Sequence, residues 1–200
     1  AHLYRPVIGD EPKCLAPVAD KPMIERIIDD LRKQGITDIT LALHYQAEKF
    51  VEKFRSTVKY TLEETPLGTG GAIKNALTDD EPTLVLNGDT FMDIDYQDML
   101  KEHAPPVTVA VVTRGAGMVN AGAFIVNREL FLSFSGAFSL EHDVLPGMKK
   151  KFYNVKWFAD LGTPEAYESA QREWGNGPSM LILDEVKAEN AKAAQSLVEW

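Results

Sequence analysis

Segments with strand character alternate with amphipathic helical segments along most of this chain, and that alternation limits the folds open to it. The clearest helix is expected over residues 22–34, where Ile24, Ile27, Ile28 and Leu31 share one face. Further helices are expected at 46–54, 71–77, 96–102 and 128–132, and strands at 36–43, 58–62, 84–89, 107–112 and 121–126. This order predicts an α/β fold: a doubly wound, mainly parallel, Rossmann-like sheet with helices on both faces.

The pattern changes after residue 163. A helix is expected over residues 165–174, and the Gly-Asn-Gly-Pro run at 175–178 ends it. We therefore expect one domain over residues 1–174 and a C-terminal helical tail over 175–200. The tail could be a packing arm, an oligomer contact or a tag remnant.

Charge and cysteine content restrict the possible partners. The net charge of −9 argues against a nucleic-acid polymer, which selects basic surfaces, but not against a single nucleotide. Cys14 is the one cysteine, which excludes an internal disulfide framework and favours a packing role over a nucleophile. The sequence has neither an apolar run of the roughly 18 residues that a membrane span needs nor a visible signal peptide. We expect a cytoplasmic protein with no membrane partner.

The run LVLNGD at residues 84–89 is expected to form a buried parallel strand that carries Asp89 to its carboxyl-terminal edge. Open α/β sheets bind ligands at that edge. A carboxylate there, with a Gly-rich turn upstream, points to a divalent metal that serves a phosphate-bearing substrate. The alternative is that Asp89 only caps the following segment.

Two loops could hold the phosphates or the base. Lys13 lies between prolines in the run PKCLAPV, where an ammonium group could neutralise charge on a phosphate, although most loop lysines are simply solvated. In EETPLGTGGAI, at residues 63–73, a tight turn would explain one glycine but not Gly68, Gly70 and Gly71 together. Such glycines let the backbone approach a base or a phosphate closely.

A second carboxylate follows an aromatic-rich strand. Asp160 lies in the run WFADLGTP at residues 157–164. With Asp89 it could complete a magnesium site, provided that the fold brings the two together. Their separation in the sequence does not show whether they meet.

Read together, these motifs resemble the sugar-1-phosphate nucleotidyltransferases, from Arg5 to Gln171. The matching runs, in order, are PKCLAPVADKPM, PLGTGGA, LNGD, NAGAFIV, FSLEHD and DLGTPEAY. Within the family the chain looks most like the bacterial D-glycero-D-manno-heptose 1-phosphate guanylyltransferases. Mannose-1-phosphate guanylyltransferases and N-acetylmuramate-1-phosphate uridylyltransferases are close competitors.

The resemblance implies an enzyme that transfers a nucleoside monophosphate from an NTP, with GTP favoured, to a sugar 1-phosphate. The NDP-sugar product would serve capsule or surface polysaccharide synthesis, and a homo-oligomer is possible. The implied roles are catalysis for Lys13, base contact for Glu63, Gly68 and Thr69, sugar binding for Asn120 and Gly122, and Mg²⁺ binding for Asp89 and Asp160. A Glu63 carboxylate could accept hydrogen bonds from guanine or equally from uracil.

The chain departs from the family pattern in two places. Leu3 stands where the arginine of a Gly-rich, triphosphate-binding loop is expected, and Arg114 runs directly into Gly115 where a phosphate-binding Glu-Lys pair is expected. Either the chain is a degenerate member, such as a catalytically silent nucleotide or sugar sensor, or residues of mobile loops are missing from it. We favour missing residues, which predicts backbone breaks near residues 1–5 and between Arg114 and Gly115. Retention of Lys13, Asp89 and Asp160 together favours an enzyme over a sensor.

Overall fold

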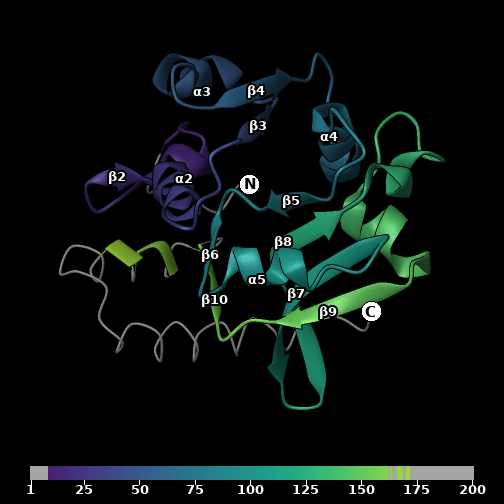
Figure 1. Ribbon diagram of the computed structural model, residues 1–200. Coiled ribbons are helices and arrows are strands. Elements are labelled where there is room, and N and C mark those ends of the chain that lie inside the picture. Colours follow the sequence, from purple (N-terminus) through teal and green to yellow (C-terminus); the bar gives the residue numbers. More distant parts are fainter. Residues whose placement is uncertain (1–8, 162, 164–165, 169, 172–200) are drawn as a thin grey trace.

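A four-stranded sheet and a smaller two-stranded sheet, each flanked by helices, organise the computed structural model (Figure 1). It describes residues 9–161, 163, 166–168 and 170–171. The four-stranded sheet has the order β5-β8-β7-β9, with bounds Thr83–Leu86, Gly117–Val126, Val107–Arg114 and Lys150–Asn154. The two-stranded sheet pairs β3 (Thr40–Leu43) with β4 (Lys59–Leu62). Two further pairs join β1 (Pro17–Val18) to β2 (Lys21–Pro22) and β6 (Thr90–Met92) to β10 (Phe158–Asp160).

The helices lie close to where the sequence predicts them. The α-helices are α2 (Met23–Lys33), α3 (Ala47–Phe54), α4 (Gly68–Ala76) and α5 (Tyr96–Lys101). Short helical turns are η1 (Lys13–Leu15), η2 (Arg128–Phe131), η3 (Leu140–Val144) and η4 (Leu145–Gly147). The expected apolar face of α2 is buried, with Ile24, Ile27, Ile28 and Leu31 in the core. No helix in this described part is long and apolar enough to cross a bilayer.

The sheet pairing is mixed rather than mainly parallel. Strands β3 and β4 are parallel, as are β7 and β9, but β8 runs antiparallel to both β5 and β7. The run at residues 84–86 is therefore an antiparallel strand, not the parallel strand that its apolar composition suggested. An apolar run reports burial on both faces, and it does not fix the direction of the neighbouring strand.

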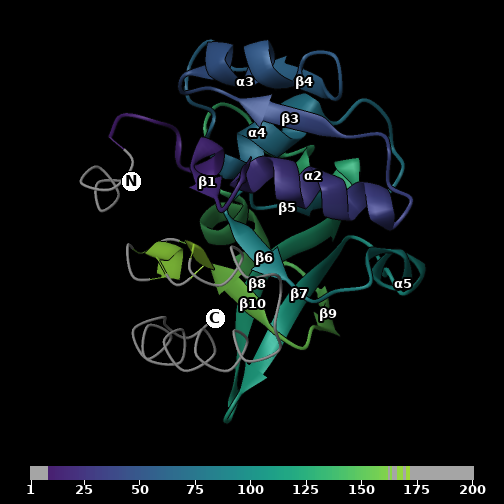
Figure 2. The same ribbon diagram turned by 90° about the vertical axis from the view of Figure 1, so that its left-hand side faces the viewer.

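Alternating side chains of the four-stranded sheet supply two separate cores. Ala123 and Ile125 of β8 point to the face that packs with α2 and α3, while Phe124 and Val126 point to the other face. That second core also contains Phe138 and the apolar residues of η2, η3 and η4. Figure 2 shows α2, α3, β3 and β4 together at one end of the molecule and the β7–β8 hairpin at the other.

The expectations about chain continuity and the C-terminal region fall only partly on described residues. The backbone turns at Gly115 and Ala116 and pairs Arg114 with Gly117, so the break predicted between Arg114 and Gly115 is wrong. The expected break near residues 1–5 lies outside the described residues. Residues 166–168 and 170–171 are helical, as expected for the helix at 165–174, and the proposed tail at 175–200 also lies outside the described residues.

Candidate active site

Lys13, Asp89 and Asp160 meet at one place. The Lys13 ammonium group donates to Asp89 Oδ2 at 2.6 Å and lies 3.6 Å from Asp160 Oδ1. The Lys13 and Asp89 side chains are 26% and 31% exposed, whereas Asp160 is 54% exposed. The predicted convergence of the two carboxylates beside the lysine loop is therefore confirmed, and the cluster is open to an incoming ligand.

A short antiparallel ladder brings the carboxylates together. Asp160, the last residue of β10, pairs with Thr90, the first residue of β6, and the Leu161 N–H donates to the Asp89 carbonyl at 3.1 Å. The η1 turn delivers Lys13 from the other side, and the Leu15 N–H closes that turn on the Pro12 carbonyl at 2.8 Å. Backbone hydrogen bonds between two segments thus fix Asp89 and Asp160 relative to each other, and a local turn fixes the backbone of Lys13.

The donor set at this cluster suits magnesium. Mg²⁺ is commonly bound by one or two carboxylates together with substrate phosphates and water, rather than by a full cage of protein ligands. Asp89 and Asp160 supply two carboxylates, and the described part of the chain contains no cluster of three or more acidic, histidine or cysteine side chains that could hold a metal. The Lys13 ammonium group offsets part of their charge. The site therefore suits a divalent cation that arrives with a phosphate ligand.

The two predicted sugar-binding residues lie next to this cluster. The Asn120 side-chain oxygen accepts from the Gly122 N–H at 2.9 Å, and the Gly122 carbonyl accepts from the Asn87 N–H at 2.8 Å. Gly122 has a φ of +80°, and a Cβ there would lie 2.8 Å from Asn87 Nδ2. Asn87 is two residues before Asp89, so this hydrogen bond joins the part of β8 that contains Asn120 and Gly122 to the β5–β6 loop that carries Asp89.

The three predicted base-contacting residues gather around a different segment. The Glu63 carboxylate accepts from the Leu67 N–H at 2.8 Å, just before α4 begins. The Thr69 hydroxyl donates to Glu141 Oε2 at 2.9 Å and accepts from the Leu140 N–H, also at 2.9 Å. The glycines of this motif belong to α4 itself, which begins at Gly68 instead of the expected residue 71.

The close approach at these glycines comes from the protein itself. A Cβ at Gly68 would lie 2.5 Å from the Phe138 carbonyl oxygen, and one at Gly70 would overlap the Phe138 ring. The N–H groups of Gly70 and Gly71 donate to the Phe138 carbonyl at 3.0 and 3.3 Å. Packing against Phe138 therefore accounts for Gly68 and Gly70, and a Cβ at Gly71 would lie 2.8 Å from Leu67 Cβ and 3.2 Å from the Gly136 carbonyl oxygen. The protein itself thus explains all three glycines that the sequence pattern attributes to contact with a ligand.

Arg114 is a basic residue that sequence reasoning did not assign to the site. Its guanidinium carbon lies 5.4 Å from the centre of the Phe158 ring, two residues before Asp160, and burial lowers the pKa of Arg114. Its Nη1 is buried with no hydrogen-bond partner among the described residues. Arg114, at the end of β7, therefore lies against β10, the strand whose last residue is Asp160.

The family of the protein is decided by a match over more than half of its length. The family model described as nucleotidyl transferase matches residues 4–121, which contain Lys13, Asp89 and the Gly-rich motif. The chain belongs to the nucleotidyl transferase family. The expectation drawn from the sequence motifs is thereby confirmed.

Two relatives of this nucleotidyl transferase carry the same name in different bacteria. The D-glycero-alpha-D-manno-heptose 1-phosphate guanylyltransferase of Aneurinibacillus thermoaerophilus is 33% identical over 211 aligned positions, covering 84% of this chain and 92% of the relative. That of Campylobacter jejuni is 33% identical over 199 positions, covering 80% of this chain and 90% of the relative. The first alignment is longer than the 200-residue chain itself, so that relative carries residues within the matched region that this chain lacks.

A solved structure agrees with the fold. HddC from Yersinia pseudotuberculosis in complex with GMP-PN superposes with a TM-score of 0.74 at 27% identity, covering 83% of this chain and 91% of that one. The α/β nucleotidyltransferase type expected from the sequence is confirmed. The four-stranded sheet of this chain contains both parallel and antiparallel pairs of strands.

The cysteine of this transferase borders the carboxylate cluster. A Cβ on Gly88 would lie 3.2 Å from Cys14 Sγ, and burial, with a smaller contribution from Asp89, raises the pKa of Cys14 to about 12. The thiol is therefore neutral at physiological pH, as a packing residue requires.

We expect native Cys14 to react with iodoacetamide at pH 8 at least about tenfold more slowly than the same thiol in urea, because the thiolate is the nucleophile. Mass spectrometry of samples quenched over time measures both rates. Equal rates in the native and unfolded proteins would contradict the neutral, packed thiol.

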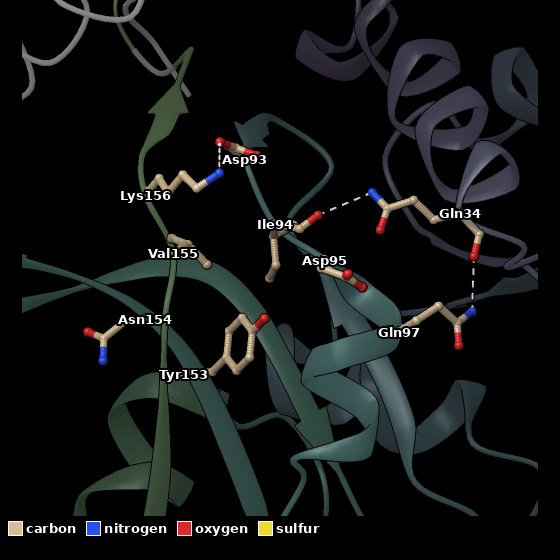
Figure 3. Close-up of a pocket in the computed structure, with 9 residues that line it drawn as sticks. All are labelled: Gln34, Asp93, Ile94, Asp95, Gln97, Tyr153, Asn154, Val155 and Lys156. Carbon is tan, nitrogen blue, oxygen red and sulfur yellow. Dashed lines mark hydrogen bonds and ion pairs between the residues drawn. The ribbon is translucent and has the colours of Figure 1, made fainter.

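A further pocket has a lining that does not include Lys13, Asp89 or Asp160. The pocket has a volume of about 540 Å³. Its lining residues come from the end of α2 (Gln34), from α5 and the segment before it, and from β9 and the segment after it (Figure 3). Its polar groups bind each other: Gln34 Nε2 donates to the Ile94 carbonyl at 3.2 Å, and Lys156 lies 3.5 Å from Asp93. None of the predicted site residues lines it, so it adds nothing to the candidate active site.

Proposed function

We propose that this protein transfers GMP from GTP to D-glycero-D-manno-heptose 1-phosphate, forming the GDP-sugar and pyrophosphate. The observation that carries the proposal is the Lys13–Asp89–Asp160 cluster, in a chain that aligns over at least four fifths of its length with two heptose 1-phosphate guanylyltransferases. A catalytically silent sensor would have no need to keep both carboxylates beside the lysine.

The reaction is an in-line displacement. An oxygen of the sugar phosphate attacks the α-phosphorus of GTP, a new P–O bond forms, and the bond to the β-phosphate breaks, so that pyrophosphate leaves with the electron pair. The Lys13 ammonium group, 2.6 Å from Asp89, lies where it can neutralise charge on the phosphates. Asp89 and Asp160 would hold Mg²⁺, which when bound would supply further neutralisation of phosphate charge.

The remaining roles follow the arrangement of the side chains. Glu63 would accept from the N1 and N2 groups of guanine, with Gly68 and Thr69 in the same loop. Asn120 and Gly122 would line the sugar subsite, since both lie beside Asn87 in the loop that leads to Asp89. Catalysis then depends on positioning and charge neutralisation, without a covalent enzyme intermediate. The proposal includes a cytoplasmic location and a role in capsule or surface polysaccharide synthesis, to which an activated heptose is the expected contributor.

Two alternative activities would use the same site: that of a mannose-1-phosphate guanylyltransferase and that of an N-acetylmuramate-1-phosphate uridylyltransferase. A Glu63 carboxylate accepts equally well from the N3–H of uracil, and mannose 1-phosphate presents the same anomeric phosphate as the heptose. The guanine choice rests on the names of the two aligned bacterial relatives.

We expect the purified protein to release pyrophosphate when it is mixed with heptose 1-phosphate, GTP and Mg²⁺, at a rate at least about tenfold above that with ATP, CTP, UTP or dTTP. A coupled phosphate assay after pyrophosphatase measures the release, and mannose 1-phosphate and N-acetylmuramate 1-phosphate serve as competing substrates. Omission of Mg²⁺ with added EDTA should abolish the signal. No pyrophosphate with any NTP would overturn the proposed function and leave the sensor as the better explanation.

A further inference from the structure

Residues 67–71, the Gly-rich start of α4 and here called the Gly-rich loop, are joined by hydrogen bonds to a segment about 70 residues further along the chain. We propose that this segment positions the Gly-rich loop for the nucleobase. The positioning segment is residues 138–143, and its principal side chain is Glu141. The inference rests on the proposed function, because it assigns these residues to the nucleotide half of that site. It also changes the role of Thr69 from nucleotide contact to positioning.

Backbone hydrogen bonds form the first connection. The Phe138 N–H donates to the Leu67 carbonyl at 2.9 Å, and the Phe138 carbonyl accepts from the N–H groups of Gly70 and Gly71. The first N–H groups of a helix have no partner within the helix, so an external acceptor is needed to satisfy them. Phe138 supplies that acceptor, and the start of α4 therefore moves only if the positioning segment moves with it.

The Thr69 hydroxyl forms the second connection. It donates its one proton to Glu141 Oε2 at 2.9 Å and accepts from the Leu140 N–H at 2.9 Å. A threonine hydroxyl carries a single proton. Because this proton is donated in the hydrogen bond to Glu141, Thr69 cannot donate a hydrogen bond to a base or a phosphate while this contact holds.

Glu141 is itself held in place at the start of η3. The Ser139 N–H donates to Asp143 Oδ2 at 2.7 Å, the His142 N–H donates to Ser139 Oγ at 3.2 Å, and Ser139 Oγ lies 3.4 Å from Glu141 Oε2. Side chains that accept from the first N–H groups of a helical turn fix its entry geometry. The carboxylate therefore meets Thr69 from a segment with little freedom of its own.

The connection continues to the predicted base-reading carboxylate. Leu67, whose carbonyl accepts from Phe138, donates its own N–H to Glu63 Oε2 at 2.8 Å. One residue thus joins the positioning segment to Glu63. A displacement of residues 138–141 would shift Leu67 and rotate the Glu63 carboxylate, which should weaken GTP binding while leaving the sugar subsite around Asn120 unchanged.

The test uses Thr69→Val, Glu141→Ala and the double variant in the full chain. Each single variant should raise the Kd for GTP, measured by titration calorimetry, about tenfold, since a hydrogen bond to a charged group is lost. The double variant should be no weaker than the worse single variant, because both changes break one contact. The KM for heptose 1-phosphate should stay within about twofold of the wild-type value.

A direct contact between Thr69 and the nucleotide would make the two effects multiply in the double variant, and that result would overturn the inference. If both single variants keep the wild-type Kd for GTP but have a lowered Tm, the contact between Thr69 and Glu141 only stabilises the fold. That result would also overturn the inference. Thr69→Ser, which keeps the hydroxyl, should retain most of the affinity that Thr69→Val loses, and Thr69→Ala takes the place of Thr69→Val if the valine variant does not fold. Glu52→Gln, an exposed glutamate on α3, is the matched control.

The same measurements separate this inference from the proposed function. If the wild-type protein binds GTP but releases no pyrophosphate, the proposed function fails, and the Kd values of the variants still decide the positioning role. If the wild-type protein does not bind GTP at all, both fail, because there is then no nucleotide for the loop to receive.

Discussion

Asp89→Asn is expected to lower kcat about a thousandfold while the protein stays folded. Asparagine keeps the size of the side chain but removes the charge that lies 2.6 Å from the Lys13 ammonium group. Loss of that charge removes one of two carboxylates available to a divalent cation and lets Lys13 turn toward Asp160. Pyrophosphate release under saturating GTP and heptose 1-phosphate measures the effect, and far-UV circular dichroism reports the fold.

A second aspartate–lysine pair provides the control. Asp38 and Lys59 lie 2.8 Å apart, but their side chains are 74% and 70% exposed, and a surface pair of this kind contributes little to stability. Asp38→Asn should therefore leave both kcat and Tm unchanged. Wild-type turnover in Asp89→Asn would contradict the role of this carboxylate, and an equal loss in Asp38→Asn would point to a nonspecific effect of charge.

The meeting of Asp89 with Asp160 shows what the sequence can predict. Each aspartate follows an apolar or aromatic run, which places it at the end of a strand, and the shared chemistry of the motifs suggested one site. The contact itself depends on β6 and β10, which have three residues each. Strands this short carry too little periodicity to be recognised. The sequence therefore predicted that the two aspartates share a site, but not the β6–β10 ladder that brings them together.

Strand direction was harder to predict than strand position. The segments at 84–86, 107–112 and 121–126 are strands as expected, yet β8 runs antiparallel to both of its neighbours. The parallel arrangement was inferred from the alternation of strands with helices. Between β7 and β8 the chain makes a tight hairpin at Gly115 and Ala116, and no helix intervenes, so the crossover that a parallel pair requires is absent at that point.

The Gly-rich motif shows why a glycine pattern alone does not identify a ligand. Three closely spaced glycines imply that something approaches the backbone. In the structure Phe138 is that neighbour for Gly68 and Gly70, whereas Leu67 and the Gly136 carbonyl lie closest to Gly71. Phe138 is far away in the sequence, in a run that gives no sign of where it will pack. A ligand and a distant aromatic side chain both require residues without a Cβ atom at these positions. Only the tertiary fold shows which of the two is the neighbour.

Gly68→Ala is expected to lower the free energy of unfolding by about 3 kcal/mol, the usual upper cost of overpacking a well-packed site. Gly68 has a φ of +70°, which costs an L-residue roughly 1 kcal/mol, and the new Cβ would lie 2.5 Å from the Phe138 carbonyl oxygen. Neither that oxygen nor the start of α4 can give way without loss of the hydrogen bonds from Gly70 and Gly71. Urea denaturation followed by circular dichroism measures the change.

Gly136→Ala separates the two contributions to this loss. Gly136 has nearly the same backbone conformation, with a φ of +71°, but a Cβ there meets no atom of the described residues within 4 Å. Its replacement should therefore cost only the conformational part, about 1 kcal/mol. The difference between the two variants measures the steric demand of Phe138 on the Gly-rich loop, and equal losses would show that the loop and residues 136–140 are not packed as tightly as the structure has them.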